Sequence, residues 1–108
     1  VVVAQIDLGS DRDALQAALG VISQKRPGTA VMLLSVDEDQ GSVSVMAASP
    51  KGAIDAGLKA GDWVREVTGV MGGKGGGRPD AAQGAGRDPA KLREGLAAAR
   101  RFALERLM

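Results

Sequence analysis

The sequence contains no cysteine and no histidine, and only 2% of its residues are aromatic. Without cysteine or histidine the chain cannot form disulfides, hold a Cys/His zinc site, use a thiol nucleophile or carry out imidazole acid–base chemistry. With so few aromatic residues, small aliphatic side chains must fill the core. No apolar run approaches the roughly 18 residues of a membrane span, and no targeting signal is visible at the N-terminus.

The remaining composition is that of one small globular domain. The 108 residues are 44% hydrophobic and include 14 basic and 13 acidic side chains. The chain opens on Val1, without a methionine and within a β-branched run, so we expect residues 1–108 to be a single domain excised from a longer chain. Residues 1–62 hold five basic and eight acidic side chains, whereas residues 63–108 hold nine basic and five acidic. A polyanionic partner would therefore bind the C-terminal part.

Apolar periodicity and glycine–proline breaks predict the elements. Strands are expected over residues 1–7, 29–36 and 42–46. Helices are expected over about 11–24, over about 60–71 and from 88 onward. Ser10 and Asp13 have the spacing of a capping box for the first helix, and Asp88 is a capping residue followed by proline. Residues 54–59 fit either a short helix or a loop.

This order predicts an α/β fold with α+β character, in which a small mixed sheet of three to four strands packs with about three helices. The continuous apolar strand over 29–36 is expected to be covered on both faces, and its hairpin partner over 42–46 to have one wetter face. Trp63 lies on the apolar stripe of the second helix, which favours a core position over stacking on a base. The acidic run 37–39 is interpreted as a solvated turn and not as a calcium loop.

A glycine-rich segment over residues 72–80 is the feature that composition does not explain. Five of its nine residues are glycine, and ordering glycine costs about 1 kcal/mol per residue relative to alanine. Close approach of a ligand to bare main chain would explain this, with N–H groups forming an anion nest and Lys74 and Arg78 adding charge. Tight turns and helix–sheet contact without a ligand are the alternative. The flanking pattern excludes a Walker or Rossmann loop. Gln83 either donates to a ligand or satisfies buried main chain.

Three stretches then resemble a known family. Residues 58–64, 71–80 and 82–84, in this order, are similar to the C-terminal globular module of alanyl-tRNA synthetases, which is a DHHA1-type domain. The resemblance covers nearly the whole chain. In DHH phosphoesterases, which share this domain type, the glycine run normally ends in histidine, whereas Arg78 stands here. This departure favours the synthetase branch.

The resemblance implies a DHHA1-like fold without catalytic residues, cofactor or metal in this chain. Alanine activation with ATP and magnesium, and editing with a zinc ion, would take place in upstream domains of a cytoplasmic parent, with an organellar one as the alternative. The module would grip the elbow of alanine tRNA, where the D- and T-loops meet, and help to present the acceptor end. Its partners would be tRNA, the other parent domains and, in some members, a second copy in a homodimer. No membrane or DNA partner is expected.

Main-chain N–H groups and arginine suit RNA, which is recognised through its backbone, 2′-hydroxyls and exposed loop bases. The residues expected to contact RNA are Gly73, Lys74, Gly75, Gly76, Gly77, Arg78, Gln83, Arg87, Arg93 and Arg100. Two further functions stay open: the same domain in a stand-alone alanyl-tRNA editing protein, and a protein-interaction or dimerisation module that docks through the basic last helix.

Overall fold

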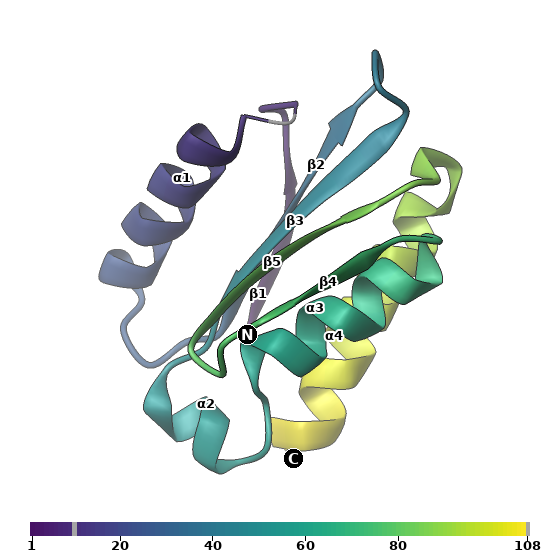
Figure 1. Ribbon diagram of the computed structural model, residues 1–108. Coiled ribbons are helices and arrows are strands. Elements are labelled where there is room, and N and C mark those ends of the chain that lie inside the picture. Colours follow the sequence, from purple (N-terminus) through teal and green to yellow (C-terminus); the bar gives the residue numbers. More distant parts are fainter. Residues whose placement is uncertain (10, 108) are drawn as a thin grey trace.

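A computed structural model describes residues 1–9 and 11–107 as a mixed sheet of five strands with helices on both faces (Figure 1). The strands are β1 (Val2–Ile6), β2 (Val31–Asp37), β3 (Ser42–Ala48), β4 (Lys74–Gly77) and β5 (Ala81–Gly86). The helices are α1 (Arg12–Lys25), α2 (Lys51–Asp55), α3 (Ala60–Val70) and α4 (Leu92–Leu107), with a short 3-10 turn η1 (Pro89–Lys91) before α4. The order across the sheet is β1-β2-β3-β5-β4, in which only β1 and β2 are parallel. The expected α/β class is confirmed.

β2 is the central strand that its continuous apolar sequence predicts. Alternate residues of a strand face opposite sides of a sheet. Val31 and Leu33 pack against α1, whereas Met32 and Leu34 join the core beneath α3 and α4. All four side chains are fully buried. Burial on both faces therefore explains why this strand shows no alternation of apolar and polar residues.

Both faces of β3 are buried, whereas one solvent-exposed face was expected. Val43, Val45 and Ala47 are buried on the side of α3 and α4. On the other side, Ser44 and Met46 are each only 5% exposed. The expectation was wrong because β3 lies inside the sheet, between β2 and β5, and α1 packs across it. The serine hydroxyls made the strand look more solvated than it is.

The glycine-rich region forms a β-hairpin and not the expected loop. β4 pairs with β5 in antiparallel register, and the N–H of Arg78 donates to the carbonyl oxygen of Ala81 at 2.9 Å to close the turn. The sheet therefore has five strands, where three to four were expected. Three of the four residues of β4 are glycine, so the strand carries almost no side-chain alternation that sequence analysis could detect.

The apolar stripe of α3 packs against α4. Trp63 is fully buried, and its indole Nε1 donates to the carbonyl oxygen of Ala99 in α4 at 2.9 Å. This confirms the predicted core position of the tryptophan. Val64 and Val67 of the same stripe are also fully buried. The contact between the two helices thus combines apolar burial with a satisfied buried donor.

The helix ends follow the expected capping chemistry in part. Asp88 caps the start of η1, where its Oδ1 accepts the N–H of Ala90 at 3.1 Å and proline follows directly. α1 is capped by Asp11, whose Oδ1 accepts the N–H of Ala14 at 3.1 Å. The expected cap, Ser10, lies outside the described residues. α2 begins at Lys51 and ends at Asp55, so the undecided stretch 54–59 is the end of a short helix followed by a turn and an irregular segment.

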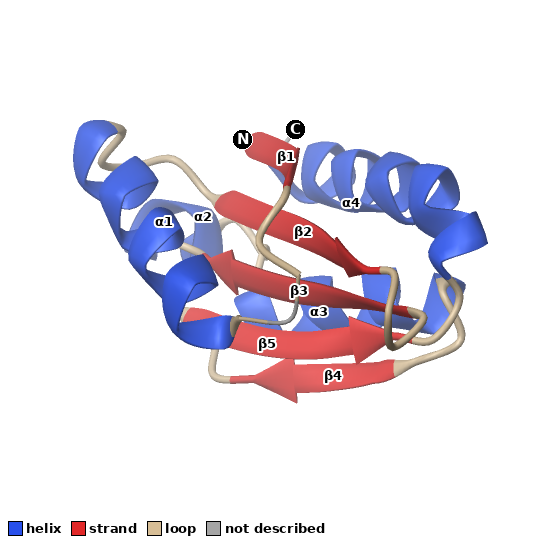
Figure 2. Cartoon of the chain, turned by 90° about the horizontal axis from the view of Figure 1, so that it is seen from above, coloured by secondary structure: helices blue, strands red, loops and turns tan. Residues whose placement is uncertain are grey.

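The helices cover the sheet unequally. α3 and α4 lie together on one face, and α1 lies on the other (Figure 2). α1 packs on β2 and β3, while α3 packs on β4 and β5 from the opposite side. On the side of α1, the hairpin of β4 and β5 therefore keeps exposed residues, among them Lys74, Ala81 and Gln83. This uncovered part of the sheet is where the candidate site lies.

Candidate nucleic-acid interface

The strand register gathers several predicted RNA-contacting side chains on one surface. Gln83 is paired with Met46 of β3, which faces α1, so Gln83 lies on the same side of the sheet. Alternate residues lie on the same side of a sheet, so Arg87, four residues after Gln83, is on this side too. Gly76 is paired with Gln83, and Lys74, Gly76 and Arg78 therefore also lie on this side. We call this surface the open face; its residues are Lys74, Gly76, Arg78, Gln83, Ala85 and Arg87.

Two hollows lie along the open face, one at each end of the hairpin. The first has a volume of ≈ 370 Å³ and is lined by Gly76, Arg78 and Gln83 together with Leu19 of α1 and Met46. Its lining combines apolar atoms with an amide and a guanidinium group, which suits a nucleobase edge or a ribose.

The second hollow has a volume of ≈ 440 Å³ and includes Lys74 and Arg87. The two hollows also contain α1 side chains that the sequence did not predict as site residues, namely Gln16 in the first and Arg12 in the second. No sequence signal could have found them, because they stand about sixty residues before the hairpin and only the fold brings them to it.

Most glycines of the hairpin have a packing reason. A Cβ atom at Gly75 would lie 2.7 Å from Val64 Cγ1 of α3 and 2.9 Å from Gly84 Cα. At Gly73 it would collide with the carbonyl oxygen of Ala85, and at Gly77 it would lie 2.8 Å from Ala82 Cα. These three glycines therefore allow main chain and helix to approach closely, which is the ligand-free interpretation of the glycine run.

Gly76 differs from its neighbours because no such crowding surrounds it. An added Cβ would have only the Arg65 guanidinium nearby, at 3.6 Å. Its φ of +157° lies in a region that side chains rarely adopt, and the residue lines the first hollow. Among the glycines of β4, Gly76 is thus the one that close packing does not explain, and its main chain lines the first hollow.

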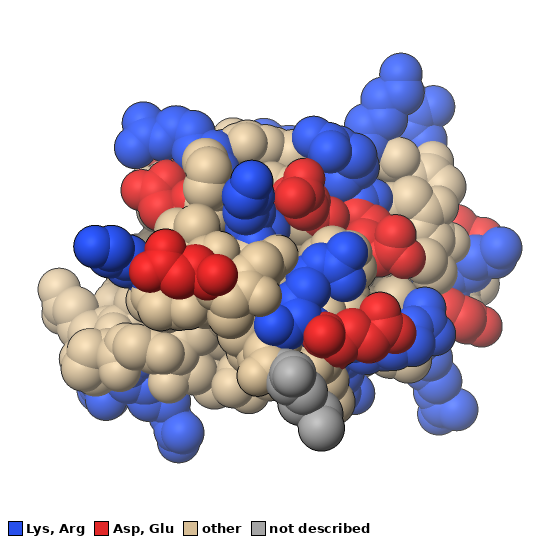
Figure 3. Space-filling model, turned by 90° about the horizontal axis from the view of Figure 1, so that it is seen from below, with Lys and Arg blue, Asp and Glu red and all other residues tan. Residues whose placement is uncertain are grey.

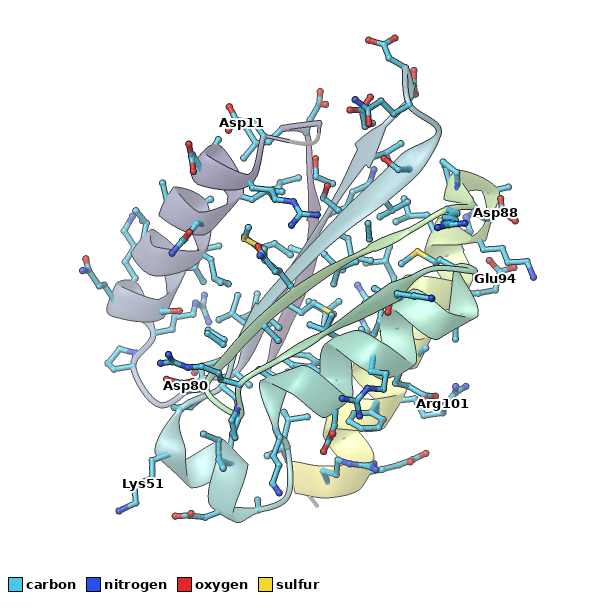
Figure 4. The ribbon with its side chains drawn as sticks, viewed as in Figure 1. Asp11, Lys51, Asp80, Asp88, Glu94 and Arg101 are labelled. Carbon is cyan, nitrogen blue, oxygen red and sulfur yellow. The ribbon has the colours of Figure 1, made fainter. Side chains whose placement is uncertain are left out.

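The cations of the open face are exposed and weakly neutralised. Arg78 Nε lies 3.5 Å from Asp80 Oδ1 at the β4–β5 turn, where Asp80 is labelled in Figure 4. Both side chains are more than half exposed, so this ion pair contributes little and does not prevent Arg78 from binding another anion. Lys74 and Arg87 form no ion pair with any residue of 1–9 or 11–107.

Arg93 and Arg100 lie elsewhere in the molecule. Both belong to α4, which covers the face of the sheet opposite to α1. Figure 4 shows α4 on the far side of the hairpin from α1, with its labelled Glu94 and Arg101. The structure therefore brings Lys74, Arg78, Gln83 and Arg87 together, and it does not bring the two arginines of α4 to the same surface.

The acidic run at residues 37–39 lies in a turn. Asp37 Oδ1 accepts the N–H of Gln40 at 3.1 Å, so the acidic run forms the expected turn. Within the described part of the chain, no three metal-ligating side chains are grouped so as to hold an ion. The surface seen in Figure 3 intermixes acidic and basic groups and does not segregate them. No helix in residues 1–9 and 11–107 has the length and apolar character needed to cross a membrane.

Comparison with known proteins shows the family. The chain is 39% identical over 107 residues to the cytoplasmic alanine–tRNA ligase of Drosophila melanogaster. The aligned region covers 99% of this chain and 11% of that protein. The chain is 40% identical over 102 residues to the alanine–tRNA ligase of Hydrogenovibrio crunogenus, covering 94% of this chain and again 11% of the relative. The chain thus spans about one ninth of the length of these relatives.

A solved structure and a family model agree with these relatives. The C-Ala domain of Aquifex aeolicus alanyl-tRNA synthetase superposes with a TM-score of 0.75 at 25% identity, covering 89% of this chain and 84% of that one. The family model described as "DHHA1 domain" matches residues 1–105. The chain therefore belongs to the DHHA1 domain family.

Proposed function

We propose that this chain is the tRNA-binding C-terminal module of an alanine–tRNA ligase and that its open face contacts the elbow of the tRNA. The observation that carries the proposal is the shared surface of Lys74, Arg78, Gln83 and Arg87. Lys74 and Gln83 lie on the two strands of the hairpin, and the two arginines directly follow those strands. Cationic side chains next to uncovered main chain and an amide match a ligand made of phosphates, riboses and exposed loop bases.

The rest of the ligase would supply the chemistry. We place alanine activation with ATP and magnesium, and editing with a zinc ion, in domains outside this chain, because the relatives are about nine times longer. The module would act with those domains by positioning the tRNA, and its own weak affinity would add to theirs through effective concentration. The similarity to the cytoplasmic ligase of Drosophila supports a cytoplasmic location for the proposed ligase.

The binding test uses a fluorescent alanine tRNA and the same tRNA with its D-loop to T-loop contact disrupted, each titrated with the chain at two salt concentrations. Tighter, salt-sensitive binding to the intact elbow is the expected result. Equal binding to both RNAs would contradict elbow recognition. No binding, together with self-association in sedimentation equilibrium, would support the dimerisation module instead.

A pair of double variants then locates the interface. Lys74→Ala/Arg78→Ala removes two cations from the open face, whereas Arg93→Ala/Arg100→Ala removes two from α4. The first is expected to weaken binding and to reduce the slope of log affinity against log salt by about two, because each lost phosphate contact removes about one unit. The second is expected to leave both quantities close to those of the wild type. Equal losses in the two variants would place the interface on both faces.

A further inference from the structure

The second hollow of the open face has a lining that distinguishes it from the other hollows. It lies where the start of α1, the start of β4 and the end of β5 meet, and its polar lining residues are Arg12, Gln40, Ser42, Ser44, Lys74 and Arg87. None of the residues that line it is acidic. Three cations and three neutral polar side chains thus surround a space of ≈ 440 Å³.

The three cations come from separate parts of the fold, and each lacks an ion-pair partner among residues 1–9 and 11–107. Arg12 is the first residue of α1, Lys74 is the first of β4, and Arg87 directly follows β5. All three are exposed, and none forms an ion pair within the described residues. Like charges that share a hollow repel one another, and an anion between them reverses the sign of that interaction.

The neutral lining adds donors of the right kind. Ser42 and Ser44 are on β3, and Ser44 is paired with Ala85 of β5 at the floor of the hollow. Serine hydroxyls and the Gln40 amide can donate to phosphate oxygens, and arginine can do so with two parallel N–H groups.

The other hollows are less suited to an anion. The first hollow contains a single cation, Arg78, and is otherwise lined by apolar, glycine and amide groups. A third hollow of ≈ 550 Å³, at the ends of β1 and β2, carries four carboxylates, those of Asp7, Asp37, Glu38 and Asp39, and therefore repels phosphate.

We propose that the second hollow is a subsite for one backbone phosphate of the bound RNA, held jointly by Arg12, Lys74 and Arg87. This inference rests on the proposed function, and it adds Arg12, a residue of α1, to an interface otherwise built from the hairpin. The carboxylates of the third hollow, three of which directly precede Gln40 in the sequence, disfavour RNA phosphates on that side of the subsite.

The test compares Arg12→Ala with Arg101→Ala, which removes an exposed arginine from α4 on the opposite face of the sheet. Arg12→Ala is expected to weaken tRNA binding about five- to tenfold, which is less than a charge-assisted hydrogen bond contributes in a buried site because this contact is exposed to solvent, and to reduce the salt slope by about one. Arg12→Lys should restore most of the salt slope because it keeps the charge. Arg101→Ala should bind as the wild type does, and far-UV circular dichroism should show the same fold in all variants.

A double-variant cycle tests whether the cations share one phosphate. If Arg12 and Lys74 bind the same group, the loss in Arg12→Ala/Lys74→Ala falls short of the product of the two single losses. If the loss of affinity in the double variant equals the product of the two single losses, the two residues bind separate phosphates, and the shared subsite is overturned. Wild-type affinity in Arg12→Ala would overturn this inference and leave the proposed function standing, whereas absence of tRNA binding in the wild type would overturn both.

Discussion

Gly61→Ala and Gly69→Ala form a matched pair of substitutions in α3. Both replace a helical glycine by alanine, which in an open position stabilises a helix by about 0.5–1 kcal/mol. A Cβ at Gly69 meets no atom within 4 Å, so the full gain is expected there. At Gly61 the Cβ would lie 2.6 Å from the Gly77 carbonyl oxygen, and the backbone of β4 would have to move. Such overpacking costs about 1–3 kcal/mol, and a clash with backbone belongs in the upper half of that range, so the free energy of unfolding should fall by about 1–2 kcal/mol after the helical gain.

These free energies translate into a clear thermal difference. Unfolding a chain of this length carries an entropy of about 0.23 kcal/mol/K, so 1 kcal/mol corresponds to a shift in Tm of about 4 °C. Gly69→Ala should raise Tm by about 2–4 °C, and Gly61→Ala should lower it by about 4–9 °C. Thermal and urea unfolding followed by far-UV circular dichroism measure both. Shifts of the same sign and size in the two variants would refute the close contact between α3 and β4 as the reason for these glycines.

Three further substitutions test individual contacts. Trp63→Phe removes the buried N–H donor to Ala99 and leaves a cavity, so urea unfolding followed by circular dichroism should show a loss of about 2–3 kcal/mol; an unchanged midpoint would contradict the α3–α4 contact. Ser49→Ala removes the buried hydroxyl that donates to the Leu58 carbonyl oxygen at 2.6 Å, with an expected loss of about 1–2 kcal/mol in the same assay. Asp11→Ala removes the cap of α1 and should lower the free energy of unfolding by about 1 kcal/mol, while Asp13→Ala, beside it, should change it less.

The sequence predicts those elements whose side chains carry a pattern. β2 could be predicted because the apolar run at residues 31–34 suits a strand buried on both faces, and α3 could be predicted because Trp63, Val64 and Val67 recur at helical spacing. The same periodicity places the tryptophan in the core. Four site residues could be predicted from the sequence: Lys74, Arg78, Gln83 and Arg87. Their side chains are charged or carry an amide, they lie in or close to an unusual glycine run, and the family resemblance pointed to RNA as the partner.

The features of the fold and the site that the sequence did not predict depend on contacts between residues far apart in the chain. β4 is held by its main-chain pairing with β5 and has only one side chain larger than hydrogen, Lys74, so its strand character was hidden. The apparent excess of glycine is explained by α3, which lies directly against Gly75 and Gly77 in three dimensions. Arg12 reaches the open face only because α1 crosses the sheet beside it.

Amide chemical-shift mapping of the ¹⁵N-labelled chain during titration with alanine tRNA tests the central claim most directly. If the open face is the interface, the largest perturbations fall on Lys74, Gly76, Gln83 and Arg87, and extend to Arg12 at the start of α1. The amides of the outer surface of α4, on the other side of the sheet, should stay near their free positions. Perturbations concentrated on α4, with the hairpin unaffected, would contradict the account.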